Sequence, residues 1–355
     1  MRDLLIIGAG ISGLRAAVRA EALGLDYQVL EARDRVGGRA YGVISSDRVG
    51  FDLGPSWIWP EHQPRVRALV ETLGLRTFDQ FETQRLRYET QAGVQTLDFP
   101  RRYGDAKRLS GGPGALALAL ADQLPGNRIR LEAEVTSLTF DAGVRVTLAK
   151  GEVLEAKRVV LAVPPRLVTR WVIEPTLPDT LTRALNAWPT WMAAHAKIFL
   201  QYDTPFWRSE TGSGSGVSQV GPLAEIVDHS DDEARLFALF GFYGWPAAVR
   251  TRRAESLEAE TLDQLERLFG PKARNPIKIG YKDWSSDPFT AVAEDAPGPN
   301  GHPPYGERAL RQPWFDGKLL FAGAEAAAEQ GGLIEGALLA ADTAMDQVEA
   351  LAERS

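Results

Sequence analysis

The sequence predicts an α/β fold, because a strand, a glycine-rich turn, a helix and a second strand follow one another at the start of the chain. Residues 3–8 are an apolar run of strand length. Apolar residues then recur at helical spacing from Leu14 to Ala22, and Gly24 offers a helix stop before the next strand at 27–31. Aromatic residues instead gather in the middle third of the chain, which predicts a separate lobe with an aromatic interior.

Later segments add strands and helices to both parts. Alternating apolar residues at 129–135 and 144–148 predict antiparallel strands with one exposed face. The continuous apolar run 159–163 instead predicts a strand buried on both faces. The remaining predicted elements are helices at 64–73 and 257–269, a proline-rich loop at 285–313, a strand at 319–321 and a final helix through Leu338 and Val348.

The composition argues against several classes of function. A net charge of -7 disfavours nucleic acid and anionic membranes as partners. The chain has no cysteine, and its four histidines lie far apart, so neither disulfides nor a local metal site is expected. No apolar run is long enough to span a membrane and no signal-peptide pattern follows Met1, so a cytoplasmic location is expected.

The glycine turn carries the strongest chemical signal. The dinucleotide fingerprint G-x-G-x-x-G is matched by Gly8, Gly10, Ile11, Ser12 and Gly13. Glu31 ends the next strand, 18 residues after Gly13, where a carboxylate can accept hydrogen bonds from an adenosine ribose. A carboxylate here favours a free 2′-hydroxyl over a 2′-phosphate, because two anions would repel each other. The fingerprint alone leaves both NAD and FAD possible.

The segment after Glu31 points to a flavin. Ala32, Arg33, Gly38 and Arg39 belong to a stretch whose paired glycines allow close backbone approach and whose arginines can balance phosphate charge. With this segment the sequence resembles the flavin-containing amine oxidase family, which includes the monoamine and polyamine oxidases. The resemblance continues in order through residues 51–57 (FDLGPSW), 110–112 (SGG), 162–165 (AVPP), 205–208 (PFWR), 284–289 (WSSDPF), 321–325 (FAGAE) and 334–337 (IEGA).

The resemblance implies the domain organisation and the cofactor. A discontinuous Rossmann-like FAD-binding domain is expected at 1–76, 110–166 and 285–355, interleaved with an α+β substrate domain at 77–109 and 167–284. FAD is expected to bind noncovalently, because Ala293 stands where cysteine-linked relatives carry the attachment residue.

The resemblance also implies the positions of the cofactor-binding residues. Val135 is expected near the adenine, and Arg39 near the flavin. Backbone and side chains near the flavin and its linker are expected from Gly54, Pro55, Ser56 and Trp57, and others along the ribityl and pyrophosphate from Gly323, Ala324 and Glu325. The final helix is expected to begin near Leu333 and Ile334, where its N-terminal amides can stabilise an anionic flavin.

Two residues are expected to act in catalysis. Lys197 precedes Pro205 by eight residues and resembles the family lysine that holds a water beside flavin N5. A desolvated ammonium there could assist reoxidation by oxygen. Considered without the family, a lysine at the start of a strand is more often a solvated surface residue. Trp284 matches the tryptophan of the motif that supplies one aromatic wall of the substrate site.

The substrate side departs from the family pattern. Val292 and Glu294 replace a glycine and a tyrosine, and Leu333 replaces the second tyrosine of the aromatic cage, so both cage positions are altered. The stretch between Trp57 and Ser110 is also short, which predicts a reduced cap and an open substrate side. These changes led us to expect a cationic or bulky amine, with Glu294 facing a distal ammonium or, alternatively, pointing to solvent.

An FAD-dependent amine oxidase is therefore expected. Hydride would pass from the carbon beside nitrogen to flavin N5, the imine would hydrolyse, and molecular oxygen would be the reoxidant. Two alternatives remain open: an FAD-dependent dehydrogenase or desaturase acting on a nonamine substrate, and a noncatalytic binding protein on the same scaffold, as in the GDP-dissociation inhibitors.

Overall fold

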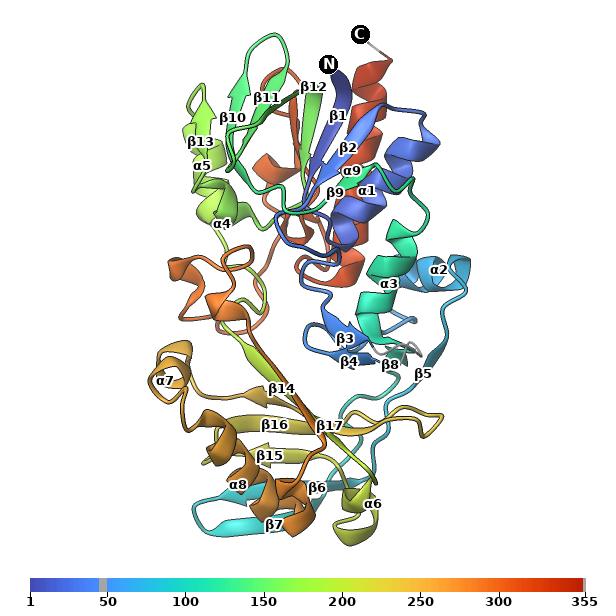
Figure 1. Cartoon of the computed structure of the whole chain (residues 1–355), viewed down its shortest axis with the longest axis vertical. Coiled ribbons are helices and arrows are strands. Elements are labelled where there is room, and N and C mark those ends of the chain that lie inside the picture. The colour runs from blue at the N-terminus through green and yellow to red at the C-terminus, as the bar shows by residue number, and fades with distance from the viewer. Residues whose placement is uncertain (45–49, 354–355) are drawn as a thin grey trace.

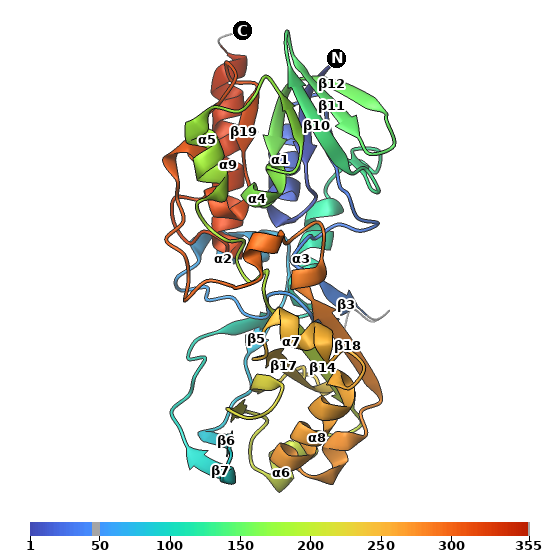
Figure 2. The same cartoon turned by 90° about the vertical axis from the view of Figure 1, so that its left-hand side faces the viewer.

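The computed structural model describes residues 1–44 and 50–353, which form two lobes, each built on one β-sheet (Figure 1). Both ends of the chain lie in the first lobe, which is uppermost in Figure 1. Seen from the side, α2 (Pro64–Thr72), β3 (Gly42–Ile44) and β5 (Thr77–Asp79) lie at the level where the lobes meet (Figure 2).

The first lobe contains a sheet of eight strands within the described residues. Their order is β13-β10-β11-β12-β1-β2-β9, with β19 also paired to β12. The strands are β1 (Arg2–Ile7), β2 (Tyr27–Leu30), β9 (Ile129–Arg130), β10 (Val135–Phe140), β11 (Val144–Leu148), β12 (Val153–Leu161), β13 (Val172–Glu174) and β19 (Leu319–Phe321). β12 runs parallel to β1 and β19 but antiparallel to β11, so the sheet is mixed.

The central strands are buried on both faces. In β1, Leu4 and Ile6 face one apolar core and Leu5 and Ile7 face the other, as the two-residue period of a strand requires. Helices α1 (Ile11–Ala22), α2, α3 (Gly112–Ala121) and α9 (Ile334–Ala352) contribute to the first core. Helices α4 (Pro165–Val168) and α5 (Asp179–Asn186) contribute to the second. Residues 159–161 of the run predicted at 159–163 are the buried end of β12, which stops at Leu161.

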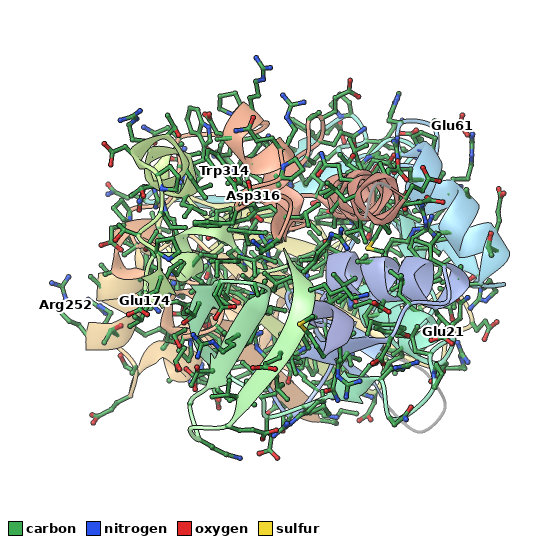
Figure 3. All side chains as sticks on the ribbon, turned by 90° about the horizontal axis from the view of Figure 1, so that it is seen from above. Glu21, Glu61, Glu174, Arg252, Trp314 and Asp316 are labelled. Atoms are coloured by element: carbon green, nitrogen blue, oxygen red, sulfur yellow. The ribbon has the colours of Figure 1, made fainter. Side chains whose placement is uncertain are left out.

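The first and last long helices pack against each other. Viewed from above, α9 is seen nearly end-on with α1 beside it (Figure 3). Arg15 and Arg19 of α1 form ion pairs with Asp342 and Asp346 of α9, at N–O distances of 2.7 and 2.9 Å. The hydroxyl of Ser12 also donates to the carbonyl of Ala322, directly after β19. The amino-terminal βαβ unit is thus completed by the carboxy-terminal segments.

The second lobe is a seven-stranded sheet within the described residues, in the order β18-β14-β17-β16-β15-β6-β7. Its strands are β6 (Arg85–Thr90), β7 (Gly93–Asp98), β14 (Ala196–Tyr202), β15 (Gly216–Ser218), β16 (Leu223–Asp228), β17 (Phe237–Tyr243) and β18 (Lys278–Asp283). Helices α6 (Phe206–Glu210), α7 (Ala247–Arg252) and α8 (Leu257–Phe269) accompany it. Ile198 and Leu200 of β14 pack with Phe269 of α8 in one core, whereas Phe199 belongs to a second core on the other face.

That second core joins the lobes. Phe51 of β4 (Gly50–Asp52) stacks on Phe199, with ring centroids 3.6 Å apart. β5 pairs with β8 (Lys107–Leu109) to form a small connecting sheet. Between Trp57 and Ser110 the chain forms α2 and strands β5 to β8, without a larger helical insertion.

Two expectations require correction. The strand predicted at 129–135 is not antiparallel: β9 covers only Ile129–Arg130 and runs parallel to β2, while the antiparallel strand β10 starts at Val135. β13 and α5 lie within the range 167–284 assigned to the substrate domain, yet β13 pairs with β10 and α5 packs in the second core of the first lobe. We therefore propose that the domain boundary lies between α5 and β14.

Among the described residues, no helix has the length and apolarity needed to cross a membrane. The same part of the chain contains no cluster of histidine and acidic side chains that could hold a metal ion.

Candidate functional site

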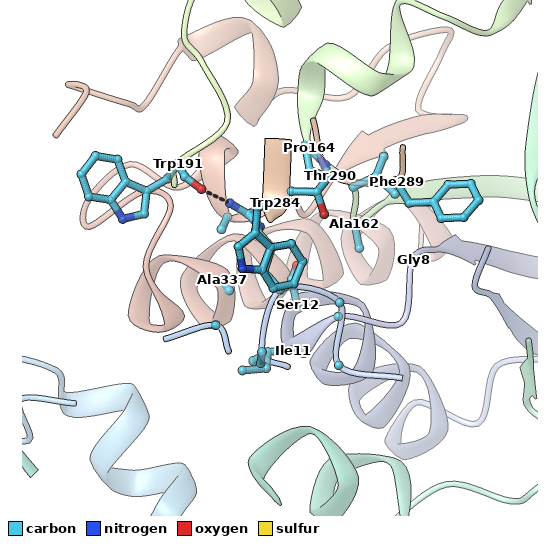
Figure 4. A pocket seen from close by; sticks show the side chains of 18 of the residues that line it. Gly8, Ile11, Ser12, Ala162, Pro164, Trp191, Trp284, Phe289, Thr290 and Ala337 are labelled. Atoms are coloured by element: carbon cyan, nitrogen blue, oxygen red, sulfur yellow. Dashed lines mark hydrogen bonds between the residues drawn. The ribbon is translucent and has the colours of Figure 1, made fainter. Parts of the chain in front are cut away.

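A cavity of about 600 Å³ extends from the carboxyl ends of β1 and β2 to β14 and β17 of the second lobe. This volume lies within the range of ligand-binding sites, and the carboxyl ends of parallel strands are where α/β sheets bind ligands. Figure 4 shows the first turn of α1, with Ile11 and Ser12, facing Trp284 across this space. The cavity therefore brings the glycine fingerprint and the second lobe together.

The three fingerprint glycines have three different structural roles. Gly8 has a φ of +104°, and a Cβ there would lie 2.7 Å from the carbonyl oxygen of Ala162. A Cβ on Gly13 would lie 1.8 Å from the carbonyl oxygen of Gly8, so the helix can pack against the strand only without a side chain. At Gly10 the nearest atom to such a Cβ is 4.0 Å away, which leaves open space at the N-terminus of α1. A diphosphate fits this space, because the helix N-terminus offers amide hydrogens and partial positive charge.

Glu31 is buried, and backbone amides fix its carboxylate. It is 3% exposed, and its two carboxylate oxygens accept hydrogen bonds from the backbone amides of Ala9 and Arg33 at 2.8 and 3.0 Å. Oε1 also accepts a longer bond from the Arg33 guanidinium at 3.5 Å, whereas Oε2 keeps a further lone pair for a hydroxyl group. The Arg33 guanidinium also donates to Asp287 at 2.6 Å, which ties the Asp-Pro-Phe segment to this end of the cavity. Val135 lines the same cavity, in agreement with its expected place near the adenine.

Arg39 is fixed by a buried carboxylate. Its two terminal nitrogens contact the two oxygens of Glu325 at 2.6 and 3.0 Å, and Glu325 is 3% exposed. Burial works to lower the pKa of Arg39, but Glu325 outweighs it, so that pKa is raised and the guanidinium stays charged. Arg39 lines the cavity and Glu325 lies behind it. Glu325 therefore positions Arg39.

Lys197 is buried. Its side chain is 2% exposed, which excludes the alternative of a solvated surface lysine. Its Nζ donates to Ser56 Oγ at 2.5 Å and to the carbonyl of Gly54 at 3.1 Å, and it lies 4.0 Å from the centre of the Phe240 ring. Lys197 also lines the cavity, so its ammonium is available to a bound ligand.

A group of buried ionisable residues surrounds Lys197. Burial lowers the pKa of Lys197 to about 7, although Asp52 opposes this effect. Burial raises the pKa of Asp52 to about 6, against the attraction of Arg108 and Lys197. Arg108 and His229 lie 4.0 and 3.5 Å from the Asp52 carboxylate. Lys197 can therefore change its charge near neutral pH, which a lysine in water cannot do.

The structure brings most of the predicted site residues together around the cavity. Its lining includes Gly8, Lys197, Trp284, Ala324 and residues 10–12, 31–33, 38–39, 54–57, 135 and 333–334. Three predicted residues lie behind the wall and not in it: Gly13 in the helix packing, Gly323 against the carbonyl of Val163, and Glu325 behind Arg39.

Glu294 is not part of the wall. It is exposed in the short 3₁₀ turn η3 (Ala293–Asp295) and does not line the cavity. The neighbouring Asp295 points inward and pairs with Arg166 at 2.8 Å. The expectation that Glu294 faces a distal ammonium is therefore wrong, because the turn directs that carboxylate to solvent.

Aromatic side chains that the sequence reasoning missed also line the cavity. Trp191, His195 and Phe242 line the cavity together with Trp57 and Trp284. The Cβ of Trp191 packs closely over Gly332, directly before the α9 N-terminus. Trp284 is fixed by a hydrogen bond from its indole nitrogen to the carbonyl of Leu53, at 2.8 Å. The position of His195 two residues before Lys197 in the sequence was the signal that could have found it.

Comparisons with known proteins agree with this geometry. Residues 84–348 match the model of the family described as flavin containing amine oxidoreductase, and residues 6–73 match that of the NAD(P)-binding Rossmann-like domain. Flavin-containing amine oxidase B of Sus scrofa is 25% identical, with 98% of this chain and 86% of the relative covered. The alignment spans 454 positions, about a hundred more than this chain has residues.

Solved structures share the fold. Cyclohexylamine oxidase from Brevibacterium oxydans superposes with a TM-score of 0.81 at 21% identity, covering 99% of each chain. Putrescine oxidase bound to putrescine gives a TM-score of 0.78 at 24% identity, covering 97% of this chain and 98% of the other. The fingerprint, the buried lysine and the family match together identify the chain as a member of the flavin-containing amine oxidoreductase family, an oxidoreductase that depends on FAD.

Proposed function

We propose that this enzyme oxidises an amine with a single nitrogen and an apolar body, with molecular oxygen as the reoxidant. The observation that carries the proposal is the position of Lys197, buried beside the aromatic part of a cavity whose other end forms a dinucleotide cradle. When bound, FAD supplies the acceptor for a hydride from the carbon beside the amine nitrogen.

The distribution of acidic residues argues for one nitrogen. Glu31 and Glu134 are the carboxylates among the described lining residues, and both neighbour the ribose and adenine positions rather than Lys197. A second ammonium placed among Trp57, Phe242 and Trp284 would have no carboxylate in the wall beside it, because Asp52 lies behind the wall and already interacts with Lys197 and Arg108. Such a desolvated charge is strongly unfavourable. We therefore replace the expected preference for cationic amines by a preference for an apolar body, which aromatic walls can bind.

Lys197 has a separate role in this proposal. Two of its three hydrogens are used on Ser56 and Gly54, which leaves one donor for the cavity. In the charged form it would place a positive charge in a poorly solvated space, where charge acts more strongly than in water. We propose that this charge and a water held by the third hydrogen assist the reduction of oxygen.

The cofactor is proposed to be held without a covalent bond. The chain has no cysteine, and Ala293 is exposed in η3 away from the cavity lining. After acid precipitation the yellow colour should stay in the supernatant. Colour that remains in the washed pellet would contradict noncovalent binding.

The deciding experiment compares hexylamine with 1,6-diaminohexane under anaerobic mixing. The two share one carbon chain and differ in the second nitrogen. We expect hexylamine to bleach the flavin with at least a ~10-fold higher second-order rate constant, since an unpaired buried charge costs well over 1.4 kcal/mol. An equal or faster reaction of the diamine would contradict the single-nitrogen proposal. Bleaching by dithionite but by no amine would favour an FAD-dependent dehydrogenase acting on a nonamine substrate.

A further inference from the structure

His195 lies on the cavity wall next to Lys197 and has no role in the proposal above. It directly precedes β14, and both residues line the cavity. His195 stands just before the strand and Lys197 is its second residue, and both reach the wall of the same cavity.

The imidazole of His195 is not used to hold the structure together. Its Nδ1 is buried and has no hydrogen-bond partner among the described residues. Its Nε2 is not among these buried unpartnered atoms. The backbone fixes this position: the amide of His195 donates to the carbonyl of Met192 at 3.1 Å, and its carbonyl accepts from the amide of Trp284 at 3.0 Å. A partly buried ring with a spare nitrogen on a cavity wall is placed to contact a ligand.

The surroundings keep this imidazole neutral. Burial lowers the pKa of His195, and the nearby guanidinium of Arg250 lowers it further. Arg250 lies on α7 and is paired with Asp283 of β18 at 2.8 Å, so its charge is partly compensated. Lys197 is the other charged group facing the ring from β14. A neutral imidazole has one nitrogen that can accept a proton.

An amine oxidase needs such an acceptor. Alkylamines are ammonium ions near neutral pH, and the nitrogen lone pair must be free before hydride can leave the neighbouring carbon. Lys197 shows what this cavity does to a primary ammonium, because burial lowers its pKa from 10.5 to about 7. A substrate ammonium beside it meets the same desolvation and becomes more acidic in the same way.

We propose that the imidazole of His195 accepts the proton of the substrate ammonium. The inference rests on the proposed amine substrate. In the step, one N–H bond of the ammonium breaks and an H–N bond to the unprotonated ring nitrogen forms, so the substrate nitrogen regains its lone pair and the imidazole becomes an imidazolium. The transfer moves one positive charge from the substrate to the ring and adds none to the charges of Lys197 and Arg39, which line the same cavity.

The test is the pH profile of anaerobic flavin reduction by hexylamine in the parent and in His195→Gln. In the parent, the second-order rate constant should rise as His195 loses its proton and fall above pH ~10, where the substrate is no longer an ammonium ion. In His195→Gln only the free amine can react. The rate constant at pH 7 should drop about 100-fold, then rise continuously towards pH ~10 and approach the parent value.

Three further proteins separate proton transfer from structural damage. His62→Gln carries the same substitution on an exposed histidine and should keep the parent profile. Lys197→Met should keep the rise of the rate constant on the acidic side of the pH profile, because His195 is intact. His195→Ala should regain reduction rate at pH 7 when imidazole is added, since imidazole can occupy the space of the lost ring.

Each outcome decides the matter. The inference would be overturned if His195→Gln kept the pH profile of the parent. It would also be overturned if the rise on the acidic side were lost in Lys197→Met but kept in His195→Gln, which would assign the proton to Lys197. A uniform loss of rate at all pH values, without rescue by imidazole, would show a structural role only. If no amine reduces the parent, the proposed function and this inference both fail, whereas reduction of the parent with an unchanged His195→Gln refutes only the inference.

Discussion

Replacing Lys197 by methionine should make the folded protein more stable at pH 7. Burial lowers the pKa of this lysine from 10.5 to about 7. At 1.36 kcal/mol per unit, and with half of the folded molecules still charged at pH 7, this costs the folded state about 4 kcal/mol. Methionine removes this cost but also loses the bonds to Ser56 and Gly54, worth about 1.5 kcal/mol each for a charged donor. The net gain is on the order of 1 kcal/mol, or roughly 1 to 2 °C in the thermal midpoint for a chain of this length.

The gain should depend on pH in a defined direction. Between pH 7 and 10.5 the unfolded lysine binds more protons than the folded one, so the stability of the parent rises with pH across this window. The free-energy cost of burying the Lys197 charge is fully present below pH 7 and absent above pH ~10.5. Above pH ~10.5 the variant has therefore lost the hydrogen bonds of Lys197 without gaining anything, and it should be the less stable protein. The upper end of the pH range is decisive, because the loss of Lys197 also raises the pKa of Asp52 above its value of about 6 in the parent.

The assay is the thermal midpoint of both proteins from pH 7 to 10.5. FAD is added in the same excess throughout, since a ligand of the folded state raises the midpoint. Lys150→Met, which changes an exposed lysine in the turn after β11, is the matched control. Its thermal midpoint should not change from higher to lower than that of the parent as the pH rises. A difference between Lys197→Met and the parent that stays constant across this range would refute the lowered pKa.

Three other changes test separate parts of the site. Gly13→Ala should abolish FAD binding and lower stability, because the new Cβ would lie 1.8 Å from the Gly8 carbonyl oxygen. Gly126→Ala, whose new Cβ has nothing within 4 Å, should do neither. Flavin absorbance after gel filtration measures the bound FAD of both variants. Lys197→Met should retain FAD but slow reoxidation at least ~10-fold, as rapid mixing of the reduced protein with oxygen would report, and an unchanged rate would remove this lysine from the oxidative step. Glu294→Gln should leave kcat/KM for hexylamine within about 2-fold of the parent, because the carboxylate is exposed, and a larger loss would return it to the substrate site.

Local patterns predicted those elements whose environment is set by their own residues. The helix at 257–269 and the strand at 319–321 coincide with α8 and β19, since periodicity and flanking glycine are local signals. The fingerprint glycines could also be assigned roles, because a turn next to a helix N-terminus restricts which residues fit. The element at 129–135 could not be placed, since Ile129 pairs in parallel with β2, Ala133 lines the cavity, and only Val135 joins an antiparallel strand.

The substrate side was predictable only in part. The sequence identified Lys197 and Trp284, but a 3₁₀ turn decides that Asp295 faces inward and Glu294 outward, and adjacent residues carry no such information. Trp191 was missed because its position depends on packing over Gly332, which is 141 residues further along the chain. Contacts of this range arise from the tertiary fold, and one sequence does not reveal them.

The packing of α9 against α1 sets the order of events during synthesis. The βαβ unit leaves the ribosome first, but α9, which covers one side of it, is made more than 300 residues later. At 5–20 residues per second, the apolar face of α1 waits roughly 15 to 60 seconds for its partner. We therefore expect loading with FAD to follow the synthesis of α9, and truncation before α9 to remove the cofactor site, including the part that the βαβ unit supplies.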